Sequence, residues 1–113
     1  MTQTAREQIV VQFRPLPSTL VRLVQETAED SSKVKFAEHA LDRMEERGIT
    51  TLDTLRVLRS GDIKGPIEAG KNKGEWKCKI VKLMKGTREI GVVTIVMSVG
   101  RLFVKTVEWE DLK

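Results

Sequence analysis

The chain has 113 residues, with 20 lysines and arginines against 16 aspartates and glutamates and a formal net charge of +4 at pH 7. Its 40% hydrophobic and 32% charged residues favour a single soluble globular domain and exclude a disordered chain. The single cysteine, Cys78, excludes an intrachain disulfide and a cysteine-cluster metal site. The longest apolar run, IGVVTIVMSVG, is about half the length needed to span a bilayer, and no secretory signal is visible. We therefore expect a cytoplasmic protein without a membrane partner.

The N-terminal stretch is expected to hold a short strand or arm, EQIVVQF, followed by a helix. Pro17 or Ser18 can begin this helix, because proline suits the first turn. Leu20, Leu23 and Val24 then fall on one helix face. The run DSSK interrupts the pattern, since serine and aspartate side chains compete for backbone hydrogen bonds.

A second helix is expected in FAEHALDRMEERGIT, residues 36–50. Its apolar side is formed by Ala37, Leu41 and Met44. The opposite side gathers polar residues, namely His39, Asp42, Arg43 and Glu46. Gly48 fits the position after a helix end, where the backbone is left-handed and a Cβ is unfavourable.

A third helix is expected in TTLDTLRVLRSG, residues 50–61. Thr50 and Asp53 resemble a capping box in which aspartate replaces the usual glutamate. The apolar positions are Leu52, Leu55 and Leu58, and Gly61 ends the helix.

The remaining chain is expected to form strands. After a loop region with a short strand around Ile67, three runs are rich in valine, isoleucine and threonine: EWKCKIVKLM, EIGVVTIVMSV and RLFVKTVEW. Short turns between them indicate an antiparallel meander of at least three strands. Helices first and strands afterwards predict an α+β fold, a single compact domain with the N-terminal helices packed on one face of the sheet.

The motif F-x-x-H-A-x-x-R-M-x-x-R-G-I runs from Phe36 to Ile49. It resembles the signature of the bacterial family known as domain of unknown function 4258, and the likeness extends over residues 34 to 109. That family is distantly similar to RelE- and MqsR-like toxins of toxin–antitoxin systems, which are small α+β ribonucleases. The resemblance implies a toxin-like domain at 34–113, with 1–33 outside the match, acting on RNA or ribosome-associated mRNA and restrained by an acidic protein antitoxin. Many RelE-like ribonucleases use a tyrosine near the cleaved phosphate, and this chain has no tyrosine.

His39 and Arg43 are the candidate catalytic residues. Metal-independent RNA cleavage needs proton transfer, which suits an imidazole, and a cation that stabilises charge on the phosphate, which suits a guanidinium. At a spacing of i, i+4, both side chains can reach one phosphate. The alternative is an ordinary solvated helix face, on which Glu46 pairs with Arg43 or His39.

The candidate nucleic-acid-binding residues are Arg47, Lys77, Lys79 and Lys82. The lysines would contact successive phosphates, and Trp76 beside them would stack on bases. Each has a structural alternative: Arg47 can interact with the helix dipole, the lysines can protect a sheet edge, and Trp76 can pack in the core.

Two functional hypotheses remain, and neither involves a metal site or a cofactor, because one histidine and one cysteine are too few for zinc and no phosphate-binding glycine loop occurs. The first is a small basic RNA-directed protein, in its sharpest form a metal-independent endoribonuclease toxin. The second is a non-catalytic binding or regulatory module that engages an acidic protein or a nucleic acid. The enzyme requires His39 and at least two cations to converge in one concave site, whereas the binding module does not.

Overall fold

The computed structural model describes residues 14–84 and 86–111. The stretch EQIVVQF lies outside these residues, so its expected strand or arm stays a prediction. The helices are α2 (Pro17–Ala28), α3 (Glu38–Arg47) and α4 (Thr51–Ser60), with a short 3-10 turn at Ser31–Lys33. The strands are β1 (Val34–Phe36), β2 (Asp62–Ile63), β3 (Glu68–Ala69), β4 (Trp76–Met84), β5 (Arg88–Met97) and β6 (Arg101–Trp109). The predicted α+β class is confirmed, and none of the described helices has the length and apolar character that crossing a membrane requires.

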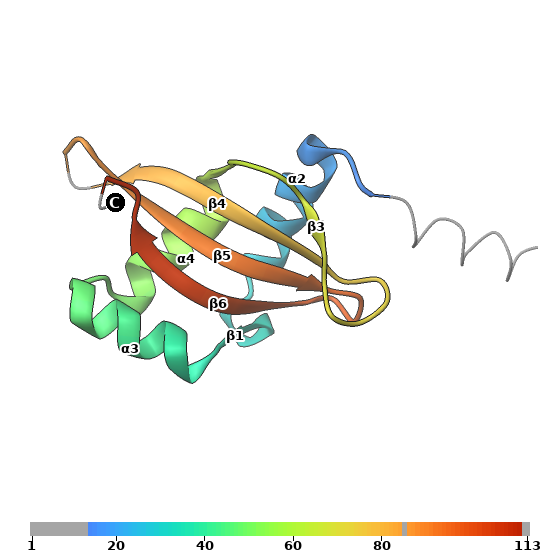
Figure 1. The fold of residues 1–113 in the computed structure, drawn as a ribbon, viewed down its shortest axis with the longest axis horizontal. Helices are drawn as coiled ribbons and strands as arrows, with labels where there is room; N and C mark the ends of the chain where they lie inside the picture. The colour runs from blue at the N-terminus through green and yellow to red at the C-terminus, as the bar shows by residue number, and fades with distance from the viewer. Residues whose placement is uncertain (1–13, 85, 112–113) are drawn as a thin grey trace, which may run out of the picture.

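The sheet is built around the predicted meander, because β4 pairs antiparallel with β5 and β5 with β6 (Figure 1). The strand order is β1-β6-β5-β4-β2, and β3 also pairs with β4. The sequence did not predict β1, which pairs parallel with β6 and places Val34 beside Leu102. The sheet is therefore mixed rather than purely antiparallel.

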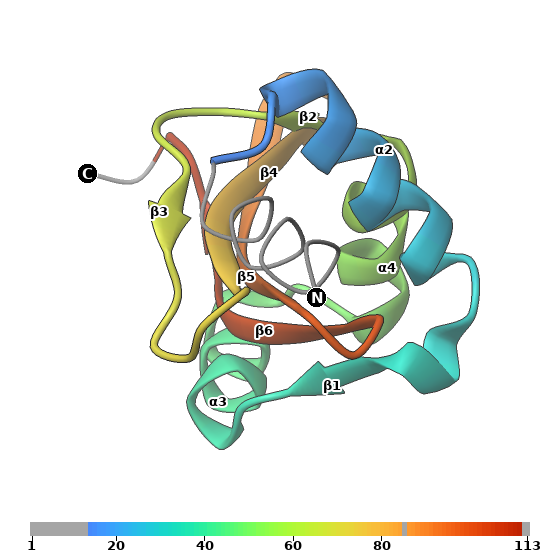
Figure 2. The same ribbon diagram turned by 90° about the vertical axis from the view of Figure 1, so that its right-hand side faces the viewer.

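The helices take two different positions around the sheet. Figures 1 and 2 show α2 and α4 together on one face, as expected for an α+β fold. In contrast, α3 lies along β6 beyond the end of β1, where the backbone N–H of Ala37 donates to Val104 O at 3.0 Å. Figure 2 shows β3 on the side of the sheet away from α2 and α4, with α3 below β6.

The predicted signals at helix ends are confirmed by backbone and side-chain geometry. Gly48 ends α3 with a φ of 68°, the left-handed conformation that glycine tolerates. Thr50 and Asp53 form a reciprocal capping box, with Asp53 N donating to Thr50 Oγ1 at 3.0 Å and Thr50 N donating to Asp53 Oδ2 at 3.1 Å. These two devices fix the sharp change of direction from α3 to α4.

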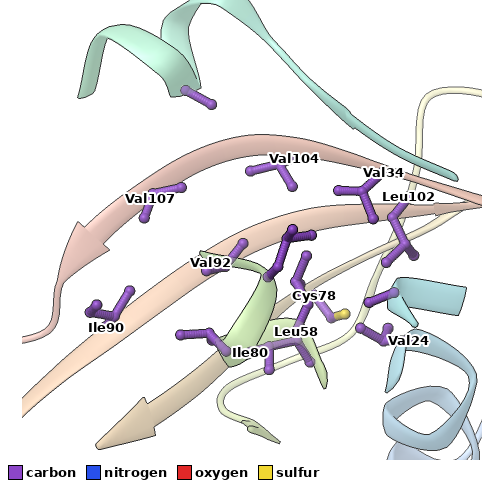
Figure 3. Packing of buried hydrophobic residues seen from close by; sticks show 14 of the residues in the cluster. Val24, Val34, Leu58, Cys78, Ile80, Ile90, Val92, Leu102, Val104 and Val107 are labelled. Carbon is purple, nitrogen blue, oxygen red and sulfur yellow. The ribbon is translucent and has the colours of Figure 1, made fainter. Parts of the chain in front are cut away.

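The core lies between the helices and one face of the sheet (Figure 3). Leu20 and Val24 of α2 are buried in the same cluster as the strand residues, so the described part of the segment before residue 34 is packed into the domain. Three leucines that the sequence assigned to apolar faces are exposed instead: Leu23 (44%), Leu41 (45%) and Leu52 (59%). In α3, the buried contacts are made by Ala40 and Met44.

A β-bulge in β6 explains why the alternation of this strand is imperfect. The register with β5 shifts between Val93 and Thr94, so that Val104 pairs with Thr94 and Thr106 with Val93. Lys105 is the extra residue. The shift returns Val107 to the buried face and leaves Lys105 outside the core.

Candidate functional site

The sheet face opposite α2 and α4 carries the predicted binding residues Lys77 and Lys79. The even-numbered residues Cys78 and Ile80 of β4 are buried under the helices, so strand alternation turns Lys77 and Lys79 to the other side. The expectation that these two lysines share one face is confirmed. We call this side the open face; its other main residues are Val93, Ile95, Met97, Phe103, Lys105, Thr106 and Glu108.

Lys82 does not belong to this surface. An odd number of residues separates Lys82 from Lys77 and from Lys79, and β4 has no bulge, so the Lys82 side chain lies on the opposite side of the strand. Lys82 is in register with the buried Ile90. Trp76 shares this helix-covered side and packs against the core. Lys82 and Trp76 therefore lie on the other side of β4 from Lys77 and Lys79, because a spacing of one or three residues changes the side of a strand. Packing of Trp76 in the core, the structural alternative, is confirmed.

The α3 residues lie on a different element from the lysines. His39 is exposed, and among the described residues no hydrogen bond or ion pair involves it. Arg43 Nη1 pairs with Glu46 Oε1 at 2.9 Å, the solvated pairing that the alternative interpretation expected. Arg47 Nη1 donates to Val107 O at 2.6 Å, and Arg47 O accepts from Trp109 Nε1 at 2.9 Å. Arg47 therefore links the end of α3 to β6 through two hydrogen bonds.

Two hollows lie side by side on the open face and share Lys77. The first, which we call the Phe103 hollow, has a volume of about 420 Å³. It is lined by Ala69, Gly70, Lys71, Asn72, Glu75, Lys77, Ile95, Met97, Phe103 and Lys105. The second, the Lys79 hollow, has a volume of about 390 Å³ and is lined by Lys64, Gly65, Pro66, Glu68, Lys77, Cys78, Lys79, Val93 and Glu108. No residue of α3 lines either hollow, so neither brings His39 or Arg43 together with the lysines.

The Lys79 hollow is already neutralised by carboxylates. Lys79 Nζ lies 3.0 Å from Glu110 Oε1 and 3.7 Å from Glu108 Oε2, and Lys64 Nζ lies 3.3 Å from the same Glu110 oxygen. The Glu110 side chain is only 5% exposed. It lies over Gly91, where a Cβ would overlap its carboxylate. Lys79, a predicted RNA contact, is therefore already paired with carboxylates of this chain, and its contact with RNA stays a prediction.

The network shifts the pKa values of both partners. Burial alone would raise the pKa of Glu110, but hydrogen bonds from Lys79 and Lys64 outweigh burial and lower the pKa. Burial likewise opposes the charged form of Lys79, yet Glu110 and Glu108 raise the pKa of Lys79. Both groups are thus stabilised in their charged forms.

Glu110 is expected to contribute stability that acid removes. Because its pKa is lower in the folded state than its ordinary value of 4.5, this contribution is present above that value and lost as the pH falls through the folded-state pKa. Thermal melts of the native chain and Glu110→Gln should therefore differ at neutral pH and converge in acid. Glu46→Gln, which breaks an exposed pair with Arg43, is the control and should change little. A difference that stays constant across the pH range would contradict the expectation.

The Phe103 hollow retains an excess of positive charge. Its lining has three lysines, Lys71, Lys77 and Lys105, against one carboxylate, Glu75. Of these lysines only Lys77 has an ion pair within the described residues, with Glu68 at 3.3 Å, and both side chains of that pair are largely exposed. Exposed pairs are weak and exchange readily. The lining of the Phe103 hollow therefore carries more cationic than anionic side chains.

Phe103 and Lys105 were not identified from the sequence as site residues. The strand run RLFVKTVEW contains both, and alternation puts them on one side, but nothing in the run marks which side faces away from the helices. A regular alternation from Phe103 would have kept Lys105 on the same side but turned Val107 outward.

Comparisons with known proteins show a family but no described activity. A family model described as a domain of unknown function (DUF4258) matches residues 36–109. Neither the curated proteins nor the solved structures give a match. The distant similarity to RelE- and MqsR-like toxins is therefore not confirmed. In the described part of the chain, no three histidine, cysteine, aspartate or glutamate side chains form a group suited to a metal ion.

Proposed function

Because this chain belongs to the DUF4258 family, whose description assigns no function, we propose from its geometry that it binds single-stranded RNA across its open face. The observation that carries the proposal is the positive Phe103 hollow, in which an aromatic ring is surrounded by lysines from separate elements. Proteins that bind single strands combine cations for the phosphates with aromatic rings on which bases stack.

The arrangement of the cations supports an extended ligand rather than a single ion. Lys71 comes from the loop after β3, Lys77 from β4 and Lys105 from the β6 bulge, so they surround the apolar floor from different sides. Lys35 of β1 is exposed and in register with Phe103, which adds a cation along the same sheet side. A strand of RNA crossing the sheet would meet successive positive charges.

Binding is favoured over catalysis by the placement of the only imidazole. An RNA-cleaving site with His39 needs that side chain beside the phosphate that the cations hold. The hollow with excess positive charge contains no residue of α3. Cleavage by His39 and Arg43, restraint by an acidic antitoxin, and a toxin role thus stay hypotheses.

Lys77→Ala is expected to weaken RNA binding, whereas Lys82→Ala is its matched control on the other face of the same strand. Fluorescence anisotropy with a labelled single-stranded RNA, titrated at several salt concentrations, measures both affinity and salt dependence. Loss of one phosphate contact should reduce the slope of log affinity against log salt by about 0.7. Equal losses from the two variants would contradict the assignment of the open face.

The same labelled RNA also tests the ribonuclease hypothesis and the hypothesis of an acidic protein partner. Cleavage on a time-course gel by the native chain but not by His39→Ala would restore the ribonuclease and overturn a purely binding role. Binding of poly-glutamate without binding of RNA would assign the lysines to an acidic protein and overturn the proposal. Intact RNA, bound with a steep salt dependence, is the expected outcome.

A further inference from the structure

We propose that the Phe103 hollow holds one nucleobase of the bound strand, stacked on Phe103 with its amino edge toward Glu75. This inference rests on the proposed function and adds to it a preference for bases that carry an exocyclic amino group. Its basis is the pairing of an apolar floor with a buried carboxylate inside an otherwise positive hollow.

The floor of the hollow suits the flat face of a base. Ile95 and Phe103 are directly opposite each other on β5 and β6, and Met97 follows on the same side of β5. All three are half-buried on the side of the sheet away from α2 and α4. An aromatic ring accepts any base by stacking, so the floor alone gives affinity without sequence preference.

The polar wall of the hollow comes from the turn between β3 and β4. Glu75 is only 9% exposed, and its backbone O accepts from Gly70 N at 2.7 Å. A Cβ at Gly70 would lie 2.6 Å from Glu75 Cβ, so glycine permits the close approach that places this side chain. The position of Glu75 is thus fixed by the turn.

The Glu75 carboxylate has capacity for a further donor. Within residues 14–84 and 86–111, its oxygens accept only from the backbone N and side-chain Nδ2 of Asn72, and each of these contacts is 3.3 Å long. Such contacts exceed the usual N–H···O distance, and an ionised carboxylate offers about four lone-pair sites. Because a buried carboxylate is costly unless it is well hydrogen-bonded, a ligand group that donates a shorter hydrogen bond to Glu75 would be stabilising.

The chemistry of the bases then predicts discrimination. Cytosine and adenine present an amino group as a donor, whereas the corresponding position of uracil is a carbonyl oxygen. A carboxylate accepts from the amino group and repels the carbonyl. Because cytosine and uracil are otherwise similar in size and stack alike, their comparison isolates this contact.

The test compares three short ligands of equal length by anisotropy: oligocytidine, oligouridine, and an abasic ribose-phosphate chain. The native chain is expected to bind oligocytidine on the order of tenfold more tightly than oligouridine, and the abasic chain more weakly than oligocytidine. In Glu75→Gln, whose amide both donates and accepts, the ratio of the two affinities should approach one. Phe103→Leu keeps an apolar floor without the ring and should reduce the advantage of oligocytidine over the abasic chain.

The outcomes separate this inference from the proposed function. Equal affinity of the native chain for oligocytidine and oligouridine, or for oligocytidine and the abasic chain, overturns the base site and leaves RNA binding standing. Absence of binding to all three ligands overturns the proposed function itself. Both results come from the native chain, so they hold even if a variant fails to fold.

Discussion

Replacing Trp109 with alanine is expected to lower the free energy of unfolding by about 3–5 kcal/mol, the usual range for losing a buried tryptophan. Trp109 is 7% exposed at the end of β6. Its Nε1 donates to Arg47 O at 2.9 Å, and the guanidinium of Arg88 lies 4.0 Å from its ring centroid. The ring therefore joins the end of α3 to the sheet, and its removal leaves a cavity and an unpaired carbonyl.

Urea unfolding followed by far-ultraviolet circular dichroism measures this loss without relying on tryptophan fluorescence. Trp109→Phe retains a ring but no N–H donor, so it should fall between the native chain and the alanine variant. Leu83→Ala removes an apolar side chain that is 58% exposed and should have a small effect. A loss for Trp109→Ala no greater than that for Leu83→Ala would show that Trp109 does not hold α3.

Reversing the charges of Lys71 and Lys105 together is expected to reduce RNA affinity by roughly tenfold or more at low salt. Both lysines line the Phe103 hollow, and neither has an ion pair within the described residues, so their positive charge is available to phosphates. If each lysine meets one phosphate, Lys71→Glu with Lys105→Glu lowers the salt slope by about 1.4. The glutamates would also repel the strand.

The control for this double variant changes net charge equally on the far side of the sheet. Arg22→Glu with Arg56→Glu alters exposed residues of α2 and α4, the helices that cover the other face. Fluorescence anisotropy should show near-native RNA affinity for this double variant. Equal losses in the two double variants would show that overall charge, rather than the open face, governs binding.

Local signals allowed much of the fold to be predicted. The three helices follow the apolar periodicity, the Thr50–Asp53 capping box and the left-handed Gly48 are confirmed, and the three long strands form the expected meander. These features depend on residues close together in the chain. The face of a short amphipathic helix was less certain, since Leu23 and Leu41 sit beside the buried stripe and are exposed.

The candidate site was harder to predict because its contacts join distant segments. Lys79 meets Glu110 31 positions away, and Arg47 bonds Val107 60 positions away. No local pattern shows that these cations are used internally. The motif around His39 identified the family. The positive hollow depends on the turn at Glu75 and on which side of the sheet the helices cover, which only the assembled sheet reveals.

The parallel pairing of β1 with β6 has a consequence for the order of folding. Val34 pairs with Leu102, and α3, α4 and strands β2 to β5 lie between them in the chain. Hairpins of the meander close small loops quickly, whereas β1 must wait for a partner near the end of the chain, at a larger entropic cost. During synthesis β6 emerges last among the strands, so β1 and α3 stay without their neighbour until then. We expect the docking of β1 and α3 to be the late, slow event of folding.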